Sequence, residues 1–350
     1  MHPAIYATTL SLLFGSSAAL LAGGWWTVAL PLFTFGAIPL GELVLSGSTE
    51  NLAVDAEPAA RDHRIYDWLL YAVVPGQVGL VVLMMWLIST GALSGLEILG
   101  AMLTVGVSCS AFGINVAHEL GHHRSRFDQA MSKILLTTSL YSHFFVEHNR
   151  GHHARVATPE DPASAARGMV VYSFWFRSVI GGYRSAWAIE DHRLRKLAHP
   201  RLTWQNEMVR LTVLQLGAIG LAALAFGPAV LAWMVSGVIG FLLLETVNYM
   251  EHYGLSREKK PNGRYERTRP EHSWNSNHPL GRALLFDLTR HSDHHANPGR
   301  KYSVLRHFDN SPQLPTGYPG MILLTLIPPL WFSVMHPHID REVARLQDAA

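Results

Sequence analysis

The stretch that decides the fold is 211-LTVLQLGAIGLAALAFGPAVLAWMVSGVIGFLLL-244, which contains no Asp, Glu, Lys or Arg. A helix that crosses a bilayer needs about 20 mainly apolar residues, so this run and its flanks are long enough for two. The Gly227-Pro228 pair near the middle predicts a turn. We therefore expect a hairpin of two membrane helices, over 207–226 and 229–250.

Similar runs lie nearer the N-terminus. No charged residue precedes Glu42, and the Gly23-Gly24 pair divides this first stretch into two spans. Two more charge-poor runs follow between Asp67 and His118. Only 15% of all residues are charged, against roughly a quarter in soluble domains. We predict one domain over 1–350, an all-α integral membrane protein with six transmembrane helices at about 4–22, 25–45, 68–90, 97–117, 207–226 and 229–250.

The basic residues predict the orientation. All 28 Lys and Arg lie at or after Arg61, and none lies in the tight turns between paired spans. The positive-inside rule then places both termini on the cytoplasmic face of a bacterial inner membrane. The segments 118–206 and 251–350 would form a cytoplasmic helical cap, in which shorter apolar patches are expected to be interfacial or re-entrant helices. These patches are 134–146, 169–180 and 321–334.

Composition excludes other classes. The net charge is +2 with His neutral, which gives no general basic field for nucleic acid. A single cysteine, Cys109, excludes an internal disulfide.

The chain has 20 histidines, and the first cluster is His118-Glu119-Leu120-Gly121-His122-His123. Residues four apart share a helix face, so His118 and His122 can share a metal. His123 lies about 140° from His118 around a helix, and we leave it out. Taken alone, this HExxH pattern is typical of a zinc protease, and a polar helix cap is the plainer alternative.

Two more clusters lie at 147-EHNRGHH-153 and 290-RHSDHH-295. In the former, the first and second His again lie four apart, and in the latter the three His share one helical stripe. His252 stands where the sixth predicted span leaves the bilayer. Nine imidazoles exceed the needs of one zinc site and suit two metals. Imidazole binds Zn, Cu, Fe and Ni, and redox chemistry favours iron. The nine candidate ligands are His118, His122, His148, His152, His153, His252, His291, His294 and His295.

Acidic residues beside these clusters are natural hydrogen-bond partners for the second nitrogen of a metal-bound imidazole. They can equally be solvated carboxylates at helix ends. The candidates are Glu119, Glu147, Glu251 and Asp293. We expect other polar residues to support or cover the site, namely His272, Asn275, Asn277 and His278, with weaker claims for His143 and His192. The remaining histidines are expected at the surface: His2, His63, His199, His307, His336 and His338.

The sequence around the histidines resembles that of the membrane alkane 1-monooxygenases, within the wider membrane desaturase–hydroxylase family. The resemblance runs from about residue 25 to 340. It is carried by 248-NYMEHYGL-255, 272-HSWNSNH-278, 290-RHSDHHA-296 and 314-LPTGYPG-320, beside the His clusters. It implies six membrane helices and two iron ions held by the same nine His. It also implies that O2 hydroxylates the terminal methyl of medium-chain linear alkanes drawn from the lipid. Electrons would come from rubredoxin, served by rubredoxin reductase.

Alternatives remain open at this point. An aryl-methyl (xylene-type) hydroxylase or an acyl-chain desaturase would share the metal site, whereas an intramembrane zinc protease would leave seven of the nine His without a role. A metal transporter would need ionisable residues in mid-membrane, which these spans almost lack. Candidate substrate-lining aromatics, which can also simply face lipid, are Trp25, Trp26, Phe33, Phe35 and Trp86. Cationic residues that could steer an acidic electron carrier, or only reflect the positive-inside rule, are Arg150, Arg155, Arg193, Arg195, Lys196, Arg300 and Lys301.

Overall fold

The computed structural model describes residues 1–348, and the regular secondary structure of this part of the chain is helical, with two isolated β-bridges. Five helical runs are long and apolar enough to cross a membrane. They are α1 (Pro3–Ala22), the run Gly24–Val44, the run Glu57–Ser89 that contains α4 (Glu57–Asp62) and α5 (Ile65–Ser89), the run Leu96–His122 and the run Glu207–Glu251.

Three of these runs contain more than one type of helix. The run Gly24–Val44 comprises η1 (Gly24–Val28), α2 (Ala29–Leu32), the π-helix η2 (Phe33–Ala37) and α3 (Ile38–Val44). The run Leu96–His122 comprises α6 (Leu96–Ser108), the π-helix η3 (Cys109–Ile114) and α7 (Asn115–His122). The run Glu207–Glu251 comprises α12 (Glu207–Phe226), η5 (Gly227–Ala229) and α13 (Val230–Glu251).

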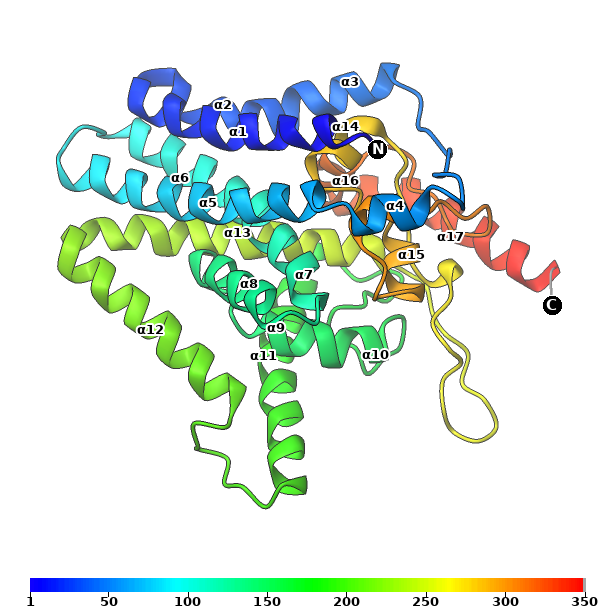
Figure 1. Ribbon diagram of the computed structural model, residues 1–350. Coiled ribbons are helices and arrows are strands. Elements are labelled where there is room, and N and C mark those ends of the chain that lie inside the picture. Colours follow the sequence, from blue (N-terminus) through cyan, green and yellow to red (C-terminus); the bar gives the residue numbers. More distant parts are fainter. Residues whose placement is uncertain (349–350) are drawn as a thin grey trace.

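The last run differs from the sequence-based expectation in form. Its 45 residues count as one candidate span, where two were predicted, so the structure gives five candidates rather than six. The elements α12, η5 and α13 follow one another without a gap, while the chain turns back on itself at η5 (Figure 1). Gly227 has φ +56°, a conformation that glycine adopts without steric cost. The predicted turn is therefore present, with a helical arm of about span length on each side.

The polar half of the molecule is built from shorter elements. They are α8 (Arg126–Thr138), α9 (Phe144–Glu147), the π-helix η4 (His148–His152), α10 (His153–Arg155), α11 (Val171–Lys196), η6 (Pro270–His272), α14 (Pro279–Leu284), α15 (His291–Ala296), η7 (Tyr302–Val304), α16 (Tyr318–Thr325) and α17 (Pro328–Asp348). Among described residues, none of the three shorter apolar patches forms a candidate span. The patch at 169–180 opens α11, which runs across the direction of the bundle (Figure 1).

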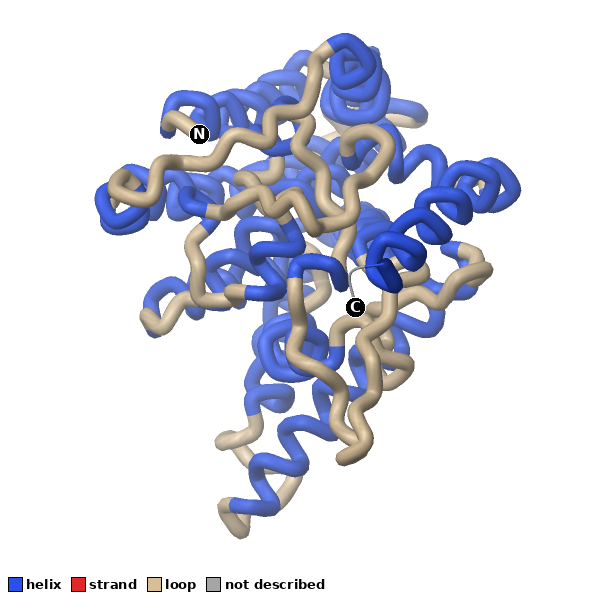
Figure 2. Tube along the Cα trace, turned by 90° about the vertical axis from the view of Figure 1, so that its right-hand side faces the viewer, coloured by secondary structure: helices blue, strands red, loops and turns tan. Residues whose placement is uncertain are grey.

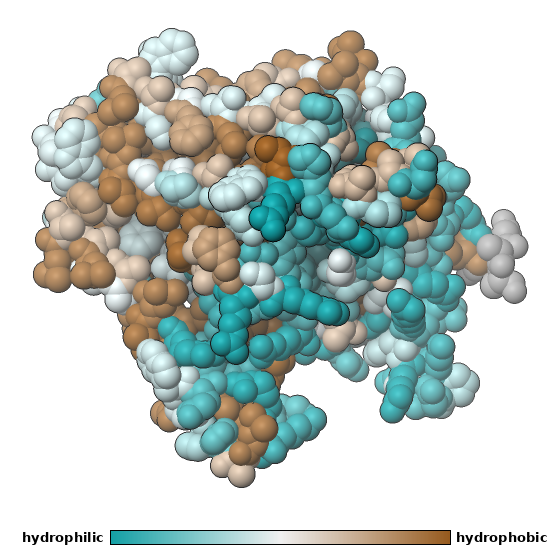
Figure 3. Space-filling view, viewed as in Figure 1, coloured by the Kyte–Doolittle hydropathy of each residue, from teal (hydrophilic) through white to brown (hydrophobic). Residues whose placement is uncertain are grey.

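The long helices lie side by side and define two ends (Figure 1). The α5–α6 loop and the α12–α13 turn lie at one end, and α7, α15 and both termini lie at the other. Hydrophobic side chains gather over the long helices, and hydrophilic ones cover the opposite end (Figure 3). Viewed from that end, the surface is rich in loops that cross over short helices (Figure 2). The histidine-bearing elements are therefore concentrated where the apolar bundle meets the polar half.

Glycine allows α6 and α13 to approach closely. A Cβ added at Gly240 would lie 2.5 Å from the Cβ of Cys109 and 3.1 Å from the carbonyl oxygen of Gly106. Small residues at such crossings are the usual basis of helix packing in membranes. This contact fixes the direction of the run that ends at His118 and His122 relative to the helix that ends at His252.

We expect Gly240→Ala to destabilise the protein by about 1–3 kcal/mol, because overpacking a tight contact forces the backbones apart. The readout is the thermal unfolding midpoint of the detergent-solubilised protein. Gly217→Ala on α12 is the matched control, since a Cβ there has nothing within 4 Å. Equal midpoints for the two variants would contradict the close-packing interpretation.

Candidate metal centre

All nine histidines singled out in the sequence come together in two groups. One group contains His118, His122, His148, His153 and His294, and the other contains His152, His252, His291 and His295. Within each group one potential ligand atom of every residue lies within 4.8 Å of all the others. The residues come from α7, from η4 and α10, from the end of α13 and from α15. Segments up to 176 residues apart thus meet at one place.

The π-helix η4 decides which histidines share a group. A π-helix closes i→i+5 hydrogen bonds and is wound more widely than an α-helix, so residues five apart come onto one face. His148 and His153 accordingly point together, with their Nε2 atoms 2.9 Å apart. His152 turns to the other group, where its Nε2 lies 3.2 Å from that of His295. The four-residue spacing of His148 and His152 therefore does not bring them into one group.

The α15 stripe is divided as well. His291 and His295 belong to the four-histidine group, and His294 belongs to the five-histidine group. The three histidines lie on one stripe of the helix, as expected. They nevertheless belong to different groups, because α15 lies between the two groups. On α7 the spacing behaves as predicted, and His118 and His122 share a group.

The nitrogen contacts fit bound cations. The Nε2 atoms of His118 and His294 are 2.7 Å apart, and that of His153 is 3.1 Å from that of His294. A neutral imidazole has one N–H and one lone pair, so protons alone cannot satisfy several Nε2 atoms that converge on one point. The Nε2 of His122 is buried and has no hydrogen-bond partner among described residues. A metal ion in each group would accept these lone pairs.

The electrostatics keep most of the imidazoles in their metal-binding form. Burial holds the pKa of His148, His153 and His294 well below the usual value, and neighbouring imidazoles add to the effect. These rings are therefore neutral at pH 7, and a neutral imidazole is what a metal needs. His152 differs. Burial by itself lowers its pKa, but the neighbouring carboxylates, Asp161 foremost with Glu147 and Glu245, together raise it above the usual value.

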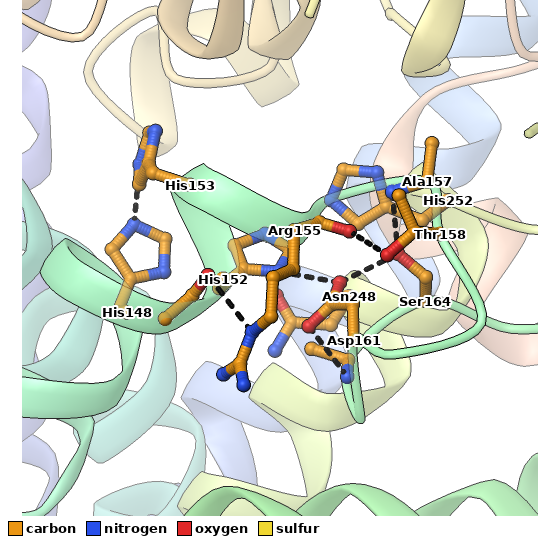
Figure 4. A network of polar contacts seen from close by, with 12 residues as sticks. His148, His152, His153, Arg155, Ala157, Thr158, Asp161, Ser164, Asn248 and His252 are labelled. Atoms are coloured by element: carbon orange, nitrogen blue, oxygen red, sulfur yellow. Dashed lines mark hydrogen bonds and ion pairs between the residues drawn. The ribbon is translucent and has the colours of Figure 1, made fainter. Parts of the chain in front are cut away.

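Asp161 is the important contact that the sequence analysis missed. Its Oδ2 lies 2.9 Å from Nδ1 of His152 (Figure 4). The Ser164 hydroxyl also donates to Oδ2 at 2.6 Å, and Arg177 holds the loop through the Asp161 carbonyl at 2.9 Å. A carboxylate on the far nitrogen orients a metal-bound imidazole and increases its basicity. The sequence offered one signal for this contact, namely that Asp161 is an acidic residue next to a proline in the short segment after the second histidine cluster.

The four predicted acidic partners lie in different surroundings. Oε2 of Glu251 is 3.2 Å from Nε2 of His291, the nitrogen that faces the metal group, and its Oε1 accepts from the Tyr318 hydroxyl at 2.7 Å. The other three form hydrogen bonds elsewhere in the described structure. Glu119 contacts His123 and the Tyr302 amide, Glu147 contacts Arg155 and Ser185, and Asp293 contacts Asn297 and the Arg306 amide.

Among the polar residues of the 272–278 segment, Asn275 contacts a ligand-bearing helix, and the other three pair with residues outside the two histidine groups. Oδ1 of Asn275 accepts the Ser292 amide at 2.8 Å, at the start of α15. His272 lies 3.2 Å from Glu266. His278 pairs with Ser276 at 3.0 Å, and Asn277 pairs with His307 at the same distance.

The histidines outside the ligand set lie in different surroundings. His123 lies outside both groups and pairs with Asp128 at 2.8 Å, as its exclusion predicted. The surface assignment of His307 is wrong, because His307 is buried where the 305–313 loop packs against Asn51 and Asn277. His336 is half-buried against the Tyr253 hydroxyl, 3.0 Å away. His143 is half-buried and packs edge-on against Tyr141, while His192 is exposed.

An apolar cavity of about 40 Å³ opens beside both groups. His118 and His148 border it from the first group and His291 from the second, and its apolar wall is Phe144, Leu244, Val247, Leu285 and Leu288. The aromatic residues proposed as lining from the sequence are mostly elsewhere. Trp25, Trp26, Phe33 and Trp86 are 88%, 65%, 42% and 49% exposed, which fits the lipid-facing alternative, while Phe35 packs partly into the core.

Comparison with known proteins agrees with this geometry. Residues 94–325 match the model of the fatty acid desaturase family. The chain is 43% identical over 309 residues to alkane 1-monooxygenase 2 of Pseudomonas aeruginosa, covering 87% of this chain and 82% of that protein. It is 38% identical over 319 residues to alkane 1-monooxygenase 1 of Alcanivorax borkumensis, covering 90% and 79%.

A third relative is less similar in sequence to this chain. The hydroxylase component of the xylene/toluene monooxygenase of Pseudomonas putida is 28% identical over 317 residues, covering 89% of this chain and 82% of that protein. The two alkane 1-monooxygenases are thus more similar to this chain than the aryl-methyl enzyme is, over comparable lengths.

Proposed function

The chain belongs to the alkane 1-monooxygenases, within the fatty acid desaturase family, and from that membership we propose that it hydroxylates the terminal methyl group of medium-chain linear alkanes. The net reaction is R–CH3 + O2 + 2 e⁻ + 2 H⁺ → R–CH2OH + H2O. A terminal C–H bond is replaced by a C–O bond, and the second oxygen atom leaves as water. The observation that carries the proposal is the pair of histidine groups bordered by one small apolar cavity.

The metal is proposed to be iron, with one ion in each group. All nine imidazoles would be its ligands, and an iron pair supplies the electrons and binding positions that activate O2. The chain's own residues do the rest. The convergent Nε2 atoms fix the coordination shape, Asp161 orients His152, and Phe144, Leu244 and Leu285 keep water from the side where a methyl group would enter. Fixing the geometry and keeping the site dry is the protein's share of metal catalysis.

We also propose six membrane crossings, with α12 and α13 as the fifth and sixth, in a bacterial inner membrane. The lengths of these two arms, 20 and 22 residues, and the position of both termini at the same end of the bundle support this arrangement (Figure 1). The metal groups then lie at the cytoplasmic surface. An alkane dissolved in the lipid would reach the apolar cavity without crossing water.

Rubredoxin is the proposed electron donor, supplied by rubredoxin reductase. The basic residues suggested for docking are not equivalent. Arg150 and Arg193 both bind the buried Glu190, and Arg155 binds Glu147. Lys301 and Arg300 likewise face carboxylates, whereas Arg195 and Lys196 are exposed at the end of α11. Steering of an acidic carrier by such charges would weaken as salt is added.

The deciding experiment is metal quantification on the purified protein, together with product identification after feeding octane, xylene and an acyl thioester. The proposal expects iron and 1-octanol. Zinc without iron and no oxygenated product would overturn it. A product formed only from xylene would indicate an aryl-methyl hydroxylase, and a double bond in the acyl chain would indicate a desaturase.

Filling the apolar cavity should obstruct the substrate. We expect Val247→Phe to lower kcat/KM for octane about 10-fold or more with unchanged iron content, because the added ring occupies space that the methyl group needs. The matched control is Val235→Phe on the same helix, where the side chain is 45% exposed and borders a groove beside the α12–α13 turn. An equal decrease in both variants would mean that the cavity at Val247 is not the substrate's position.

A further inference from the structure

A second cavity lies beside the metal groups, on the side of α11. It has a volume of about 10 Å³ and touches both His148 of the five-histidine group and His152 of the four-histidine group. That volume holds about one water molecule when polar partners are present. Two carboxyl groups, of Glu147 and Glu245, and the hydroxyl-bearing Ser178 also line it. The metal groups are therefore bordered by the apolar cavity and by this smaller, polar cavity, and Phe144, His148 and Asn248 line both.

Glu245 of α13 has unusual surroundings for a buried acid. Its side chain is almost fully buried, and it accepts hydrogen bonds from the Tyr141 hydroxyl at 2.7 Å, the Ser178 hydroxyl and the Asn248 amide at 3.3 Å. No Lys or Arg pairs with it among described residues. A buried carboxylate without a cation is costly, so a structural role would favour an ion pair. Glu190, which binds Arg150 and Arg193, is such a case.

The polar cavity also reaches toward solvent. Glu147 Oε1 accepts from Nη2 of Arg155 at 2.8 Å and from the Ser185 hydroxyl at 3.3 Å. The Arg155 side chain is 29% exposed. On the α11 wall, Gly182 has no side chain, and a Cβ there would touch Glu147 and His143 at 3.8 Å. Polar groups thus extend from the surface through the cavity to Glu245 and the two histidines.

The proposed reaction consumes two protons for each O2, and the apolar cavity has to stay dry. We propose that Glu245 is a proton-relay residue, which passes protons from water in the polar cavity toward the metal groups. The carboxyl oxygens of Glu245 hold the proton, and the external electron carrier supplies the two electrons. This inference rests on the proposed function.

Two substitutions at the same position separate proton transfer from structure. Glu245→Gln keeps the size and hydrogen-bonding capacity of the side chain but cannot carry an acidic proton. Glu245→Asp keeps the acid but shortens the side chain. If Glu245 relays protons, alcohol formation should fall about 100-fold in the Gln variant, within the usual range for acid–base groups, and less in the Asp variant. More O2 should be consumed per alcohol formed in the Gln variant, and iron content should match the wild type in both.

The opposite order, with Gln active and Asp inactive, would show that Glu245 only anchors Tyr141 and Ser178, and would overturn the inference. Wild-type coupling in both variants, or loss of iron in both, would overturn it as well. Glu42→Gln is the matched control, because Glu42 is another buried acid of a long helix and accepts the Gly281 amide at 2.7 Å. If the Glu245 variants do not fold, Ser178→Ala replaces them and should also raise the O2 consumed per alcohol, whereas unchanged coupling would overturn the relay. A wild-type protein that forms no alcohol would refute the proposed function, not the relay.

Discussion

Replacing His152 with alanine is expected to abolish alkane hydroxylation and to lower the iron content from about two ions per chain to about one. His152 belongs to the four-histidine group, which keeps only three imidazoles without it. The loss also leaves the buried Asp161 carboxylate without its partner at 2.9 Å. Since even the residues behind a ligand contribute about 10–100-fold to affinity or activity, removal of the ligand itself should exceed about 100-fold.

A parallel substitution tests whether the two groups are separate sites. His148→Ala removes a ligand of the five-histidine group, so it should also lower the iron content by about one while leaving the other group occupied. His123→Ala is the control, because His123 is adjacent to His122 in the chain but pairs with Asp128 outside both groups. Full iron content and activity in His152→Ala would contradict the assignment of the site, and loss of iron in His123→Ala would contradict the division into groups.

The sequence was sufficient for the helical membrane fold and for the set of candidate ligands. Long runs without charge can only be buried in lipid or protein, and composition reveals them directly. The nine histidines stood out because three clusters and His252 lie in the segments predicted on one side of the membrane, and the structure brings all nine together. The assignment of His118 and His122 to one group followed from α-helical spacing alone.

The division of the other ligands between groups could not be predicted from spacing. For His148, His152 and His153 it depends on the π-helix at 148–152, and the change from i→i+4 to i→i+5 hydrogen bonds has no signature in the residues themselves. For His291, His294 and His295 it depends on the position of α15 between the two groups. The burial of His307 depends on a contact with Asn51, 256 residues away. The two alternatives left open for the aromatic residues show the same limit, because hydropathy does not distinguish a lipid-facing ring from one that lines a cavity.

Asp161 gives the second large expected effect, and it depends on a contact that only the structure shows. The carboxylate is fully buried and accepts from the Ser164 hydroxyl as well as facing Nδ1 of His152. Asparagine has nearly the same shape but no negative charge. We expect Asp161→Asn to lower iron affinity or hydroxylation by about 10–100-fold, because the His152 ring loses both its orientation and part of its basicity.

A second Asp–His pair in the same protein provides the matched control. Asp128 lies 2.8 Å from Nδ1 of His123, a geometry close to that of Asp161 and His152, but His123 belongs to neither metal group. Asp128→Asn should therefore leave iron affinity unchanged in a competition titration with a chelator. If both variants lose iron equally, the effect of Asp161 is general destabilisation of the polar half. If only Asp161→Asn does, the charge behind His152 acts on the metal, and the loop after η4 is part of the site.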